Sequence, residues 1–117
     1  MKNLINYIKK NKTKKIIFIS SMSVYGQNKD KIVNENTHIN KPDFYGESKL
    51  YGEKLLKEIS NKIPSVSIRL PGVVGTKKGT SLLYRFYSNL RKNTFIKIYN
   101  QNEYFNNVIH ISDLIDF

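Results

Sequence analysis

The stretch Lys15-Ile16-Ile17-Phe18-Ile19-Ser20 is a run of apolar residues with a polar residue at each end. Such a run is typical of a strand that is buried on both faces of a parallel sheet. It leads directly into Ser20-Ser21-Met22-Ser23-Val24-Tyr25-Gly26 and a polar loop, residues 22–44, in which no element is predicted. We therefore place a central strand of a sheet here.

Helical and strand-like patterns alternate on both sides of this strand. Apolar residues at helical spacing predict helices over 3–12, 45–61 and from Thr80, as N-cap, to about Lys92, and Ser112 is predicted to cap a further helix up to Phe117. Strands are predicted at Ser65 to Leu70, where Pro71 and Gly72 end the strand, at Phe95 to Tyr99 and at Phe105 to Ile111. This alternation predicts an α/β fold with flanking helices.

Length and composition exclude several classes of protein. The 117 residues suffice for one domain, so a two-domain enzyme is not expected. Without cysteine there is no disulfide or thiolate metal site, and only His38 and His110 could offer imidazole ligands. No apolar run approaches the roughly 20 residues that a membrane span needs. We expect no metal, no membrane contact and a cytoplasmic location.

The net charge of +11 comes from two blocks, residues 1–15 and 63–92, each rich in basic residues and free of acidic ones. Nucleic-acid binding modules favour arginine and interleaved aromatic residues, whereas lysine makes up 17 of the 20 basic residues here. A solvated lysine-rich surface is therefore favoured over a nucleic-acid partner.

The segment Tyr45-Gly46-Glu47-Ser48-Lys49 opens a predicted helix. Residues four apart share a helix face, so the Tyr45 phenol and the Lys49 ammonium can address one substrate, and a nearby cation can lower a tyrosine pKa enough for proton transfer. The same spacing also fits a half-buried aromatic residue beside a solvated lysine. The position in the predicted fold favours a proton-transfer site, because Ser21 and the start of this helix would lie at the carboxyl edge of a parallel sheet, where α/β proteins bind ligands.

Several motifs occur in order along the chain. They are Ser20-Ser21-Met22-Ser23-Val24-Tyr25-Gly26, the region of Glu35, Tyr45-Gly46-Glu47-Ser48-Lys49, Ile68-Arg69-Leu70-Pro71-Gly72-Val73-Val74-Gly75 and Val108-Ile109-His110-Ile111-Ser112-Asp113-Leu114. With them the sequence resembles the extended short-chain dehydrogenase/reductase family, in its NAD-dependent epimerase/dehydratase branch. The resemblance implies a partial Rossmann-like parallel sheet.

The resemblance also implies roles for individual residues. Ser21 and Tyr45 would be catalytic, Tyr45 as the acid/base on a sugar hydroxyl, and Lys49 would hold the nicotinamide ribose and lower the tyrosine pKa. Pro71, Gly72 and Val73 would border the nicotinamide of NAD or NADP. Substrate would contact Ser21, Ser23 and Tyr25.

Three departures narrow this interpretation. Met22-Ser23 stands where sugar-nucleotide dehydratases carry Asp-Glu, which disfavours dehydration, and Asn106 stands where many relatives carry a pyrophosphate-binding arginine. The family's Gly-rich phosphate loop has no counterpart, because Gly72, Gly75 and Gly79 have a different spacing. We therefore expect residues 1–117 to be a single partial domain, the central part of a longer enzyme that lacks its dinucleotide-loop half and its C-terminal end, and to bind NAD weakly or not at all by itself.

The predicted function is that of a nucleotide-sugar epimerase or a related sugar oxidoreductase. The alternative is an inactive fragment that serves only as an interaction piece, with a homodimer formed through helices 3–12 and 45–61. His38 is predicted to be solvated, and His110 to be a hydrogen-bonded structural histidine.

Overall fold

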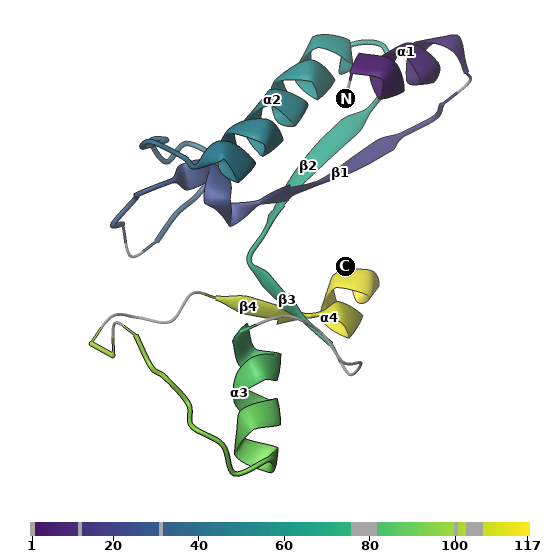
Figure 1. Cartoon of the computed structure of the whole chain (residues 1–117). Coiled ribbons are helices and arrows are strands. Elements are labelled where there is room, and N and C mark those ends of the chain that lie inside the picture. Colours follow the sequence, from purple (N-terminus) through teal and green to yellow (C-terminus); the bar gives the residue numbers. More distant parts are fainter. Residues whose placement is uncertain (1, 12, 31, 76–81, 100, 103–106) are drawn as a thin grey trace. The chain divides into compact units, whose positions relative to one another are not determined.

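The computed structural model describes residues 2–11, 13–30, 32–75, 82–99, 101–102 and 107–117. The chain divides into two compact units, Met1–Leu70 and Pro71–Phe117, and each is described by itself (Figure 1). The prediction of one partial domain over residues 1–117 stays a prediction.

The first unit is built around a strand–helix–strand arrangement (Figure 1). Its elements are α1 (Lys2–Lys10), β1 (Ile16–Ser21), the 3-10 turn η1 (Met22–Tyr25), α2 (Phe44–Ile59) and β2 (Ser65–Leu70). β1 and β2 pair in parallel, from Ile16 opposite Ser65 to Ser21 opposite Leu70. Each helix and strand that periodicity predicts in this unit is present, with bounds within about two residues, as periodic patterns allow.

The core of this unit lies where α1 meets α2. Ile5 and Ile8 of α1 and Leu56 and Ile59 of α2 are buried together, and Ile16, Phe18, Leu55 and Ile63 pack against them. Leu56 and Ile59 belong to a helix through which the alternative prediction forms a homodimer, and they are buried within the chain itself. The apolar stripes of the two helices match because both follow the spacing of three and four residues that keeps side chains on one face.

The prediction that β1 is buried on both faces is wrong for the described chain. Ile16, Phe18 and Ser20 face the helices, whereas Ile17 is 59% exposed and Val66, directly opposite it on β2, is 48% exposed. Successive strand residues point to opposite faces, and no helix described within Met1–Leu70 covers the second one. We call the side chains of Ile17, Ile19 and Val66 the open face.

The loop between β1 and α2 is more ordered than its polar composition predicts. After η1, Gly26 forms an isolated parallel bridge with Asn40, and it has a positive φ of 65°. A side chain at Gly26 would collide with the Asn40 carbonyl oxygen. The loop is therefore fastened back onto η1 just before α2 begins, where the Asp43 carboxylate accepts a hydrogen bond from the Gly46 N–H at 2.7 Å.

The second unit contains β3 (Gly72–Val74), α3 (Leu82–Arg91), β4 (Val108–His110) and α4 (Ile111–Asp116). β3 and β4 pair in parallel, with Gly72 opposite Val108. β2 ends at Leu70 as expected, and Gly72 then opens a further strand, β3. Thr80 and residues 105–106, to which an N-cap and part of a strand were assigned, lie outside the described residues.

Two predictions for the second unit are wrong. Phe95 to Tyr99 form no strand, and Phe95 is fully exposed, since no strand described in this unit pairs with the segment. Ser112 does not cap α4, because His110 is the N-cap and its Nδ1 accepts a hydrogen bond from the Ser112 N–H at 3.3 Å. His110 is a hydrogen-bonded structural residue, as expected.

Candidate functional site

The carboxyl end of β1 leads into a tight turn that contains two of the candidate hydroxyl groups. Ser21 is the last residue of β1 and the N-cap of η1. Its Oγ accepts a hydrogen bond from the Ser23 N–H at 3.1 Å and donates one to the Ser23 Oγ at 3.1 Å. The structure therefore places the Ser21 and Ser23 hydroxyls side by side.

The first turn of α2 packs directly on this serine turn. Gly46 makes the approach possible, because a side chain there would overlap the Ser23 carbonyl oxygen and lie 2.9 Å from the Pro42 Cβ. A glycine is thus required at position 46 so that the two backbones can approach closely. The sequence motif alone does not indicate this role. The contact brings Tyr45, the preceding residue, to the end of β1 that carries Ser21.

Tyr45 and Lys49 lie together, as their spacing predicts. The Lys49 Nζ is 5.5 Å from the centre of the Tyr45 ring and 5.4 Å from that of Phe18, and it donates a hydrogen bond of 2.8 Å to the Ile19 carbonyl oxygen. Tyr45 is 53% exposed, so solvent and a ligand can reach its phenol. The ammonium is held by the strand and two aromatic faces, within range of cation–π attraction.

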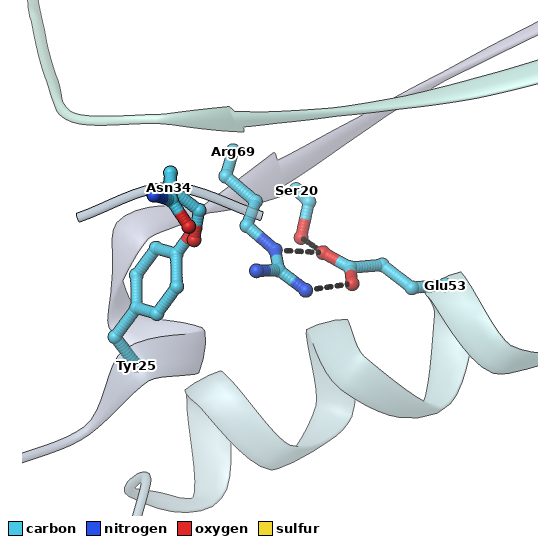
Figure 2. A network of polar contacts seen from close by, with 5 residues as sticks. All are labelled: Ser20, Tyr25, Asn34, Glu53 and Arg69. Atoms are coloured by element: carbon cyan, nitrogen blue, oxygen red, sulfur yellow. Dashed lines mark hydrogen bonds and ion pairs between the residues drawn. The ribbon is translucent and has the colours of Figure 1, made fainter. Parts of the chain in front are cut away.

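A network of polar side chains joins β1, α2 and β2 one helical turn farther along (Figure 2). The Glu53 carboxylate accepts hydrogen bonds from the Ser20 Oγ at 2.5 Å, from the Arg69 Nε at 3.0 Å and from the Arg69 Nη2 at 2.7 Å. The Arg69 guanidinium lies 4.8 Å from the centre of the Tyr25 ring. We call Ser20, Glu53 and Arg69 the clamp.

Burial and charge act against each other at the clamp. Burial raises the pKa of Glu53, but hydrogen bonds from Arg69 and Ser20 and the charge of Arg69 outweigh it and hold that pKa below its usual value. The Glu53 hydrogen bond raises the pKa of Arg69. The Arg69 Nη1 is buried without a hydrogen-bond partner among the described residues, and it lies on the Tyr25 side of the guanidinium (Figure 2). These pKa shifts keep both the Glu53 carboxylate and the Arg69 guanidinium ionised at neutral pH.

Tyr25 makes structural contacts within the first unit. It is buried, and its hydroxyl donates a hydrogen bond of 2.9 Å to the Asn34 carbonyl oxygen (Figure 2). The predicted contact between Tyr25 and substrate stays a prediction.

The remaining candidate residues are divided between the units. Pro71, Gly72 and Val73 belong to the second unit, where Pro71 is half-buried and Gly72 and Val73 open β3. Ser21, Ser23, Tyr45 and Lys49 all belong to the first. No cluster of three or more potential metal ligands occurs among the described residues, and none of the described helices has the length and apolar character of a membrane span.

Sequence reasoning missed the clamp, although a signal for Glu53 was present. Tyr45, Lys49 and Glu53 follow one another at intervals of four, so they lie on one stripe of α2. A carboxylate on the stripe that faces the sheet calls for a basic partner. Arg69, in the alternating pattern of β2, is that partner.

Comparison with known proteins identifies the family. The model of the NAD dependent epimerase/dehydratase family matches residues 1–117. The chain belongs to the NAD-dependent epimerase/dehydratase family. The predicted resemblance is thereby confirmed over the whole chain.

Individual members of the family support this assignment. The chain is 28% identical over 120 residues to the N-acetyl-alpha-D-glucosaminyl-diphospho-ditrans,octacis-undecaprenol 4-epimerase of Escherichia coli O157:H7, covering 99% of the chain and 35% of that protein. The UDP-glucuronic acid 4-epimerase of Bacillus cereus, solved in complex with UDP-glucuronic acid and NAD, is 28% identical, with a TM-score of 0.84 over 96% of the chain and 36% of its own.

A third relative shows the same fold. The UDP-N-acetylglucosamine 4-epimerase of Methanobrevibacter ruminantium M1, solved in complex with UDP-N-acetylmuramic acid, has a TM-score of 0.88 at 24% identity, over 97% of the chain and 39% of its own. The predicted α/β, Rossmann-like fold class is confirmed. The chain spans little more than a third of the length of these epimerases.

Proposed function

We propose that the chain supplies the proton-transfer site of an NAD-dependent nucleotide-sugar 4-epimerase. One observation carries this proposal: the Tyr45 phenol and the Lys49 ammonium lie side by side at the end of β1 that bears Ser21. The names of the E. coli and B. cereus relatives, both 4-epimerases, support the reaction. A related sugar oxidoreductase would use the same three residues.

Each residue has a role that its surroundings support. Tyr45 is exposed and takes the proton from a sugar hydroxyl and returns it. The Ser21 hydroxyl has one proton, which it donates to the Ser23 Oγ in the free chain and would turn to the same sugar oxygen when substrate binds, and Ser23 extends this polar surface. NAD, when bound, would supply the hydride chemistry, while the protein orients the sugar and manages the proton.

Lys49 fits the ribose end of a dinucleotide. An ammonium has three N–H donors, and one of them goes to the Ile19 carbonyl, so two can bind ribose hydroxyls. Pro71, Gly72 and Val73 are proposed to border the nicotinamide of NAD or NADP. The described residues contain no Gly-rich loop between a strand and a helix that could hold the pyrophosphate.

We further propose that residues 1–117 form the central part of a longer Rossmann-type domain. The open face supports this, because parallel sheets are normally covered on both sides and Ile17, Ile19 and Val66 are apolar and exposed. The chain's coverage of 35% to 39% of its relatives agrees with it. A cytoplasmic location stays part of this proposal.

The experiment that tests the function is a hybrid enzyme in which residues 1–117 replace the matching third of the B. cereus UDP-glucuronic acid 4-epimerase. We expect NAD-dependent inversion of UDP-glucuronic acid at C4, followed by proton NMR. The Tyr45→Phe change should lower the rate by about 100-fold or more, as for loss of a general acid/base. Tyr51→Phe, on the same helix, is the control. A hybrid that keeps its rate with Tyr45→Phe would refute the proposal.

One observation favours the alternative, in which the chain is an inactive piece that only forms a homodimer through helices 3–12 and 45–61. Leu4 and Tyr7 of α1 and Tyr51 of α2 are exposed, although Leu56 and Ile59 are occupied within the chain. Sedimentation equilibrium of the 117-residue chain tests it. A monomer at all concentrations would exclude the dimer.

A further inference from the structure

Three side chains on one stripe of α2 face the carboxyl end of β1. Tyr45 opens the stripe, Lys49 donates to the carbonyl oxygen of Ile19, and Glu53 accepts from the hydroxyl of Ser20. Two consecutive residues of the stripe thus hold two consecutive residues of the strand. The next residue of β1 is Ser21, so the two hydrogen bonds hold the two residues that directly precede it.

Of the two residues, Glu53 is anchored more firmly than Lys49. Its carboxylate accepts three hydrogen bonds, two of them in a bidentate pair from Arg69 on β2. The side chains of Arg69 and Glu53 are only 20% and 15% exposed, and charge-assisted bidentate pairs of this kind combine strength with fixed geometry. The clamp therefore fixes α2 against both strands at once.

The clamp also reaches the loop that precedes α2. The Arg69 guanidinium lies over the Tyr25 ring, and the Tyr25 hydroxyl donates a hydrogen bond to the Asn34 carbonyl oxygen (Figure 2). By contrast, Lys49 has one hydrogen bond of its own, on a long and flexible side chain. The position of Lys49 thus depends on how firmly the rest of the stripe is held.

A buried ion pair gives little net stability, because desolvation offsets much of the attraction between its charges. Catalytic groups, in contrast, must be held close to their working geometry by surrounding side chains. A bidentate pair one helical turn from Lys49 meets that need. Stability alone is a weaker explanation, since apolar side chains at these two positions could serve it as well.

We propose that Glu53 is a positioning residue: through Ser20 and Arg69 it holds the stripe of α2 against β1, and so keeps the Lys49 ammonium on the Ile19 carbonyl and beside the Tyr45 ring. Its importance for catalysis rests on the proposed function. Its effect on Lys49 does not, and that effect can be measured without turnover.

The test is NMR of the complete 117-residue chain. The rings of Phe18 and Tyr45 should shift the ε-methylene protons of Lys49 upfield of those of Lys54, which is exposed on the same helix. We expect Glu53→Gln to remove most of this upfield shift. Two matched controls should leave it in place: Glu58→Gln, the same change at an exposed site of α2, and Ile59→Val, which loosens the core end of α2.

The proposal is overturned if folded Glu53→Gln keeps the Lys49 shift, or if Ile59→Val removes it equally, since general loosening would then be the cause. Should Glu53→Gln fail to fold, Ser20→Ala replaces it. This change removes the hydrogen bond from Ser20 to Glu53 and should reduce the upfield shift of Lys49 in part. An unchanged shift would overturn the proposal. Loss of the shift together with an inactive hybrid enzyme would refute the proposed function and leave the positioning role standing.

Discussion

The two compact units differ in what they do with their apolar side chains. The first unit, Met1–Leu70, contains every buried apolar side chain of the described chain, namely Ile5, Ile8, Val24, Tyr25, Leu56, Ile59 and Leu70. In the second unit, Pro71–Phe117, none of the described residues is buried, and Phe95 and Phe117 are almost wholly exposed. Yet α3 has an amphipathic pattern as clear as that of α2.

This difference shows that an amphipathic pattern becomes a core only where a matching surface meets it. In the first unit α1 and α2 cover each other and one face of β1. Within the described part of the second unit, no element closes over the apolar residues of α3. The candidate catalytic residues Ser21, Tyr45 and Lys49 all lie in the unit that has a core, which can hold them in place.

The largest expected effect comes from deleting the same side chain in each unit. Leu56 is 3% exposed and Leu90 is 67% exposed. We expect Leu56→Ala to lower the free energy of unfolding by roughly 2 to 5 kcal/mol, because it leaves a cavity between α1 and α2. Leu90→Ala should change it by less than about 0.5 kcal/mol. Urea unfolding followed by far-UV circular dichroism measures both, and equal losses would contradict the contrast.

Acid should weaken the first unit through the clamp. The pKa of folded Glu53 lies below its ordinary 4.5, so the unfolded chain binds more protons in this range. The stabilisation is complete above that ordinary value and is lost as the pH falls through the lower folded value. Urea midpoints measured between neutral and acidic pH should show this decline.

Glu53→Gln should make the stability of the first unit less dependent on pH and should cost about 1 to 3 kcal/mol at neutral pH. Glu58→Gln, at an exposed position of the same helix, should leave the pH profile as it is. An unchanged acid profile in Glu53→Gln would show that other carboxylates govern the decline.

Two glycines offer the next comparison. A side chain at Gly46 meets the backbone of Ser23, whereas one at Gly75 meets the Cγ2 methyl group of Ile111 at 3.2 Å. We expect Gly46→Ala to destabilise the first unit by about 1 to 3 kcal/mol, the usual cost of overpacking. This should outweigh the roughly 1 kcal/mol that alanine gains over glycine in a helix. Gly75→Ala should cost less, and a Gly46→Ala protein with a higher melting temperature would contradict the close contact.

The smallest effect is expected at the start of α4. His110→Ala removes the Nδ1 acceptor of the Ser112 N–H and should cost about 0.5 to 1 kcal/mol, as loss of an N-cap does. Faster amide exchange confined to residues 111–116 would report it. Ser112→Ala keeps the backbone donor and the histidine acceptor, so its exchange should change less. Equal exchange in both variants would show that the hydroxyl contact at 2.6 Å, rather than the cap, holds the turn.

Much of the first unit could be predicted from the sequence. Helices over 3–12 and 45–61 and a strand from Ser65 to Leu70 appear within about two residues of their predicted bounds. The shared face of Tyr45 and Lys49 is also a consequence of spacing alone. These features are local, since each depends on residues only a few positions apart.

The predictions that failed depended on distant partners. Phe95 to Tyr99 has the pattern of a strand, but a strand needs another strand to pair with. β1 has the composition of a strand covered on both sides, but among the described residues of Met1–Leu70 only α1 and α2 cover it, on one face. The clamp joins residues up to 33 positions apart, and no local pattern connects Ser20 with Glu53 or Glu53 with Arg69.

The sequence by itself determined the α/β class, the family and the stripe that carries Tyr45 and Lys49, because periodicity and ordered motifs state which residues share a face. Only the tertiary structure decided what each face meets: Leu56 and Ile59 against α1, Gly46 against the Ser23 carbonyl, and Glu53 between Ser20 and Arg69. The physical reason is that burial and buried ion pairs are properties of two surfaces in contact, and the second surface is distant in sequence.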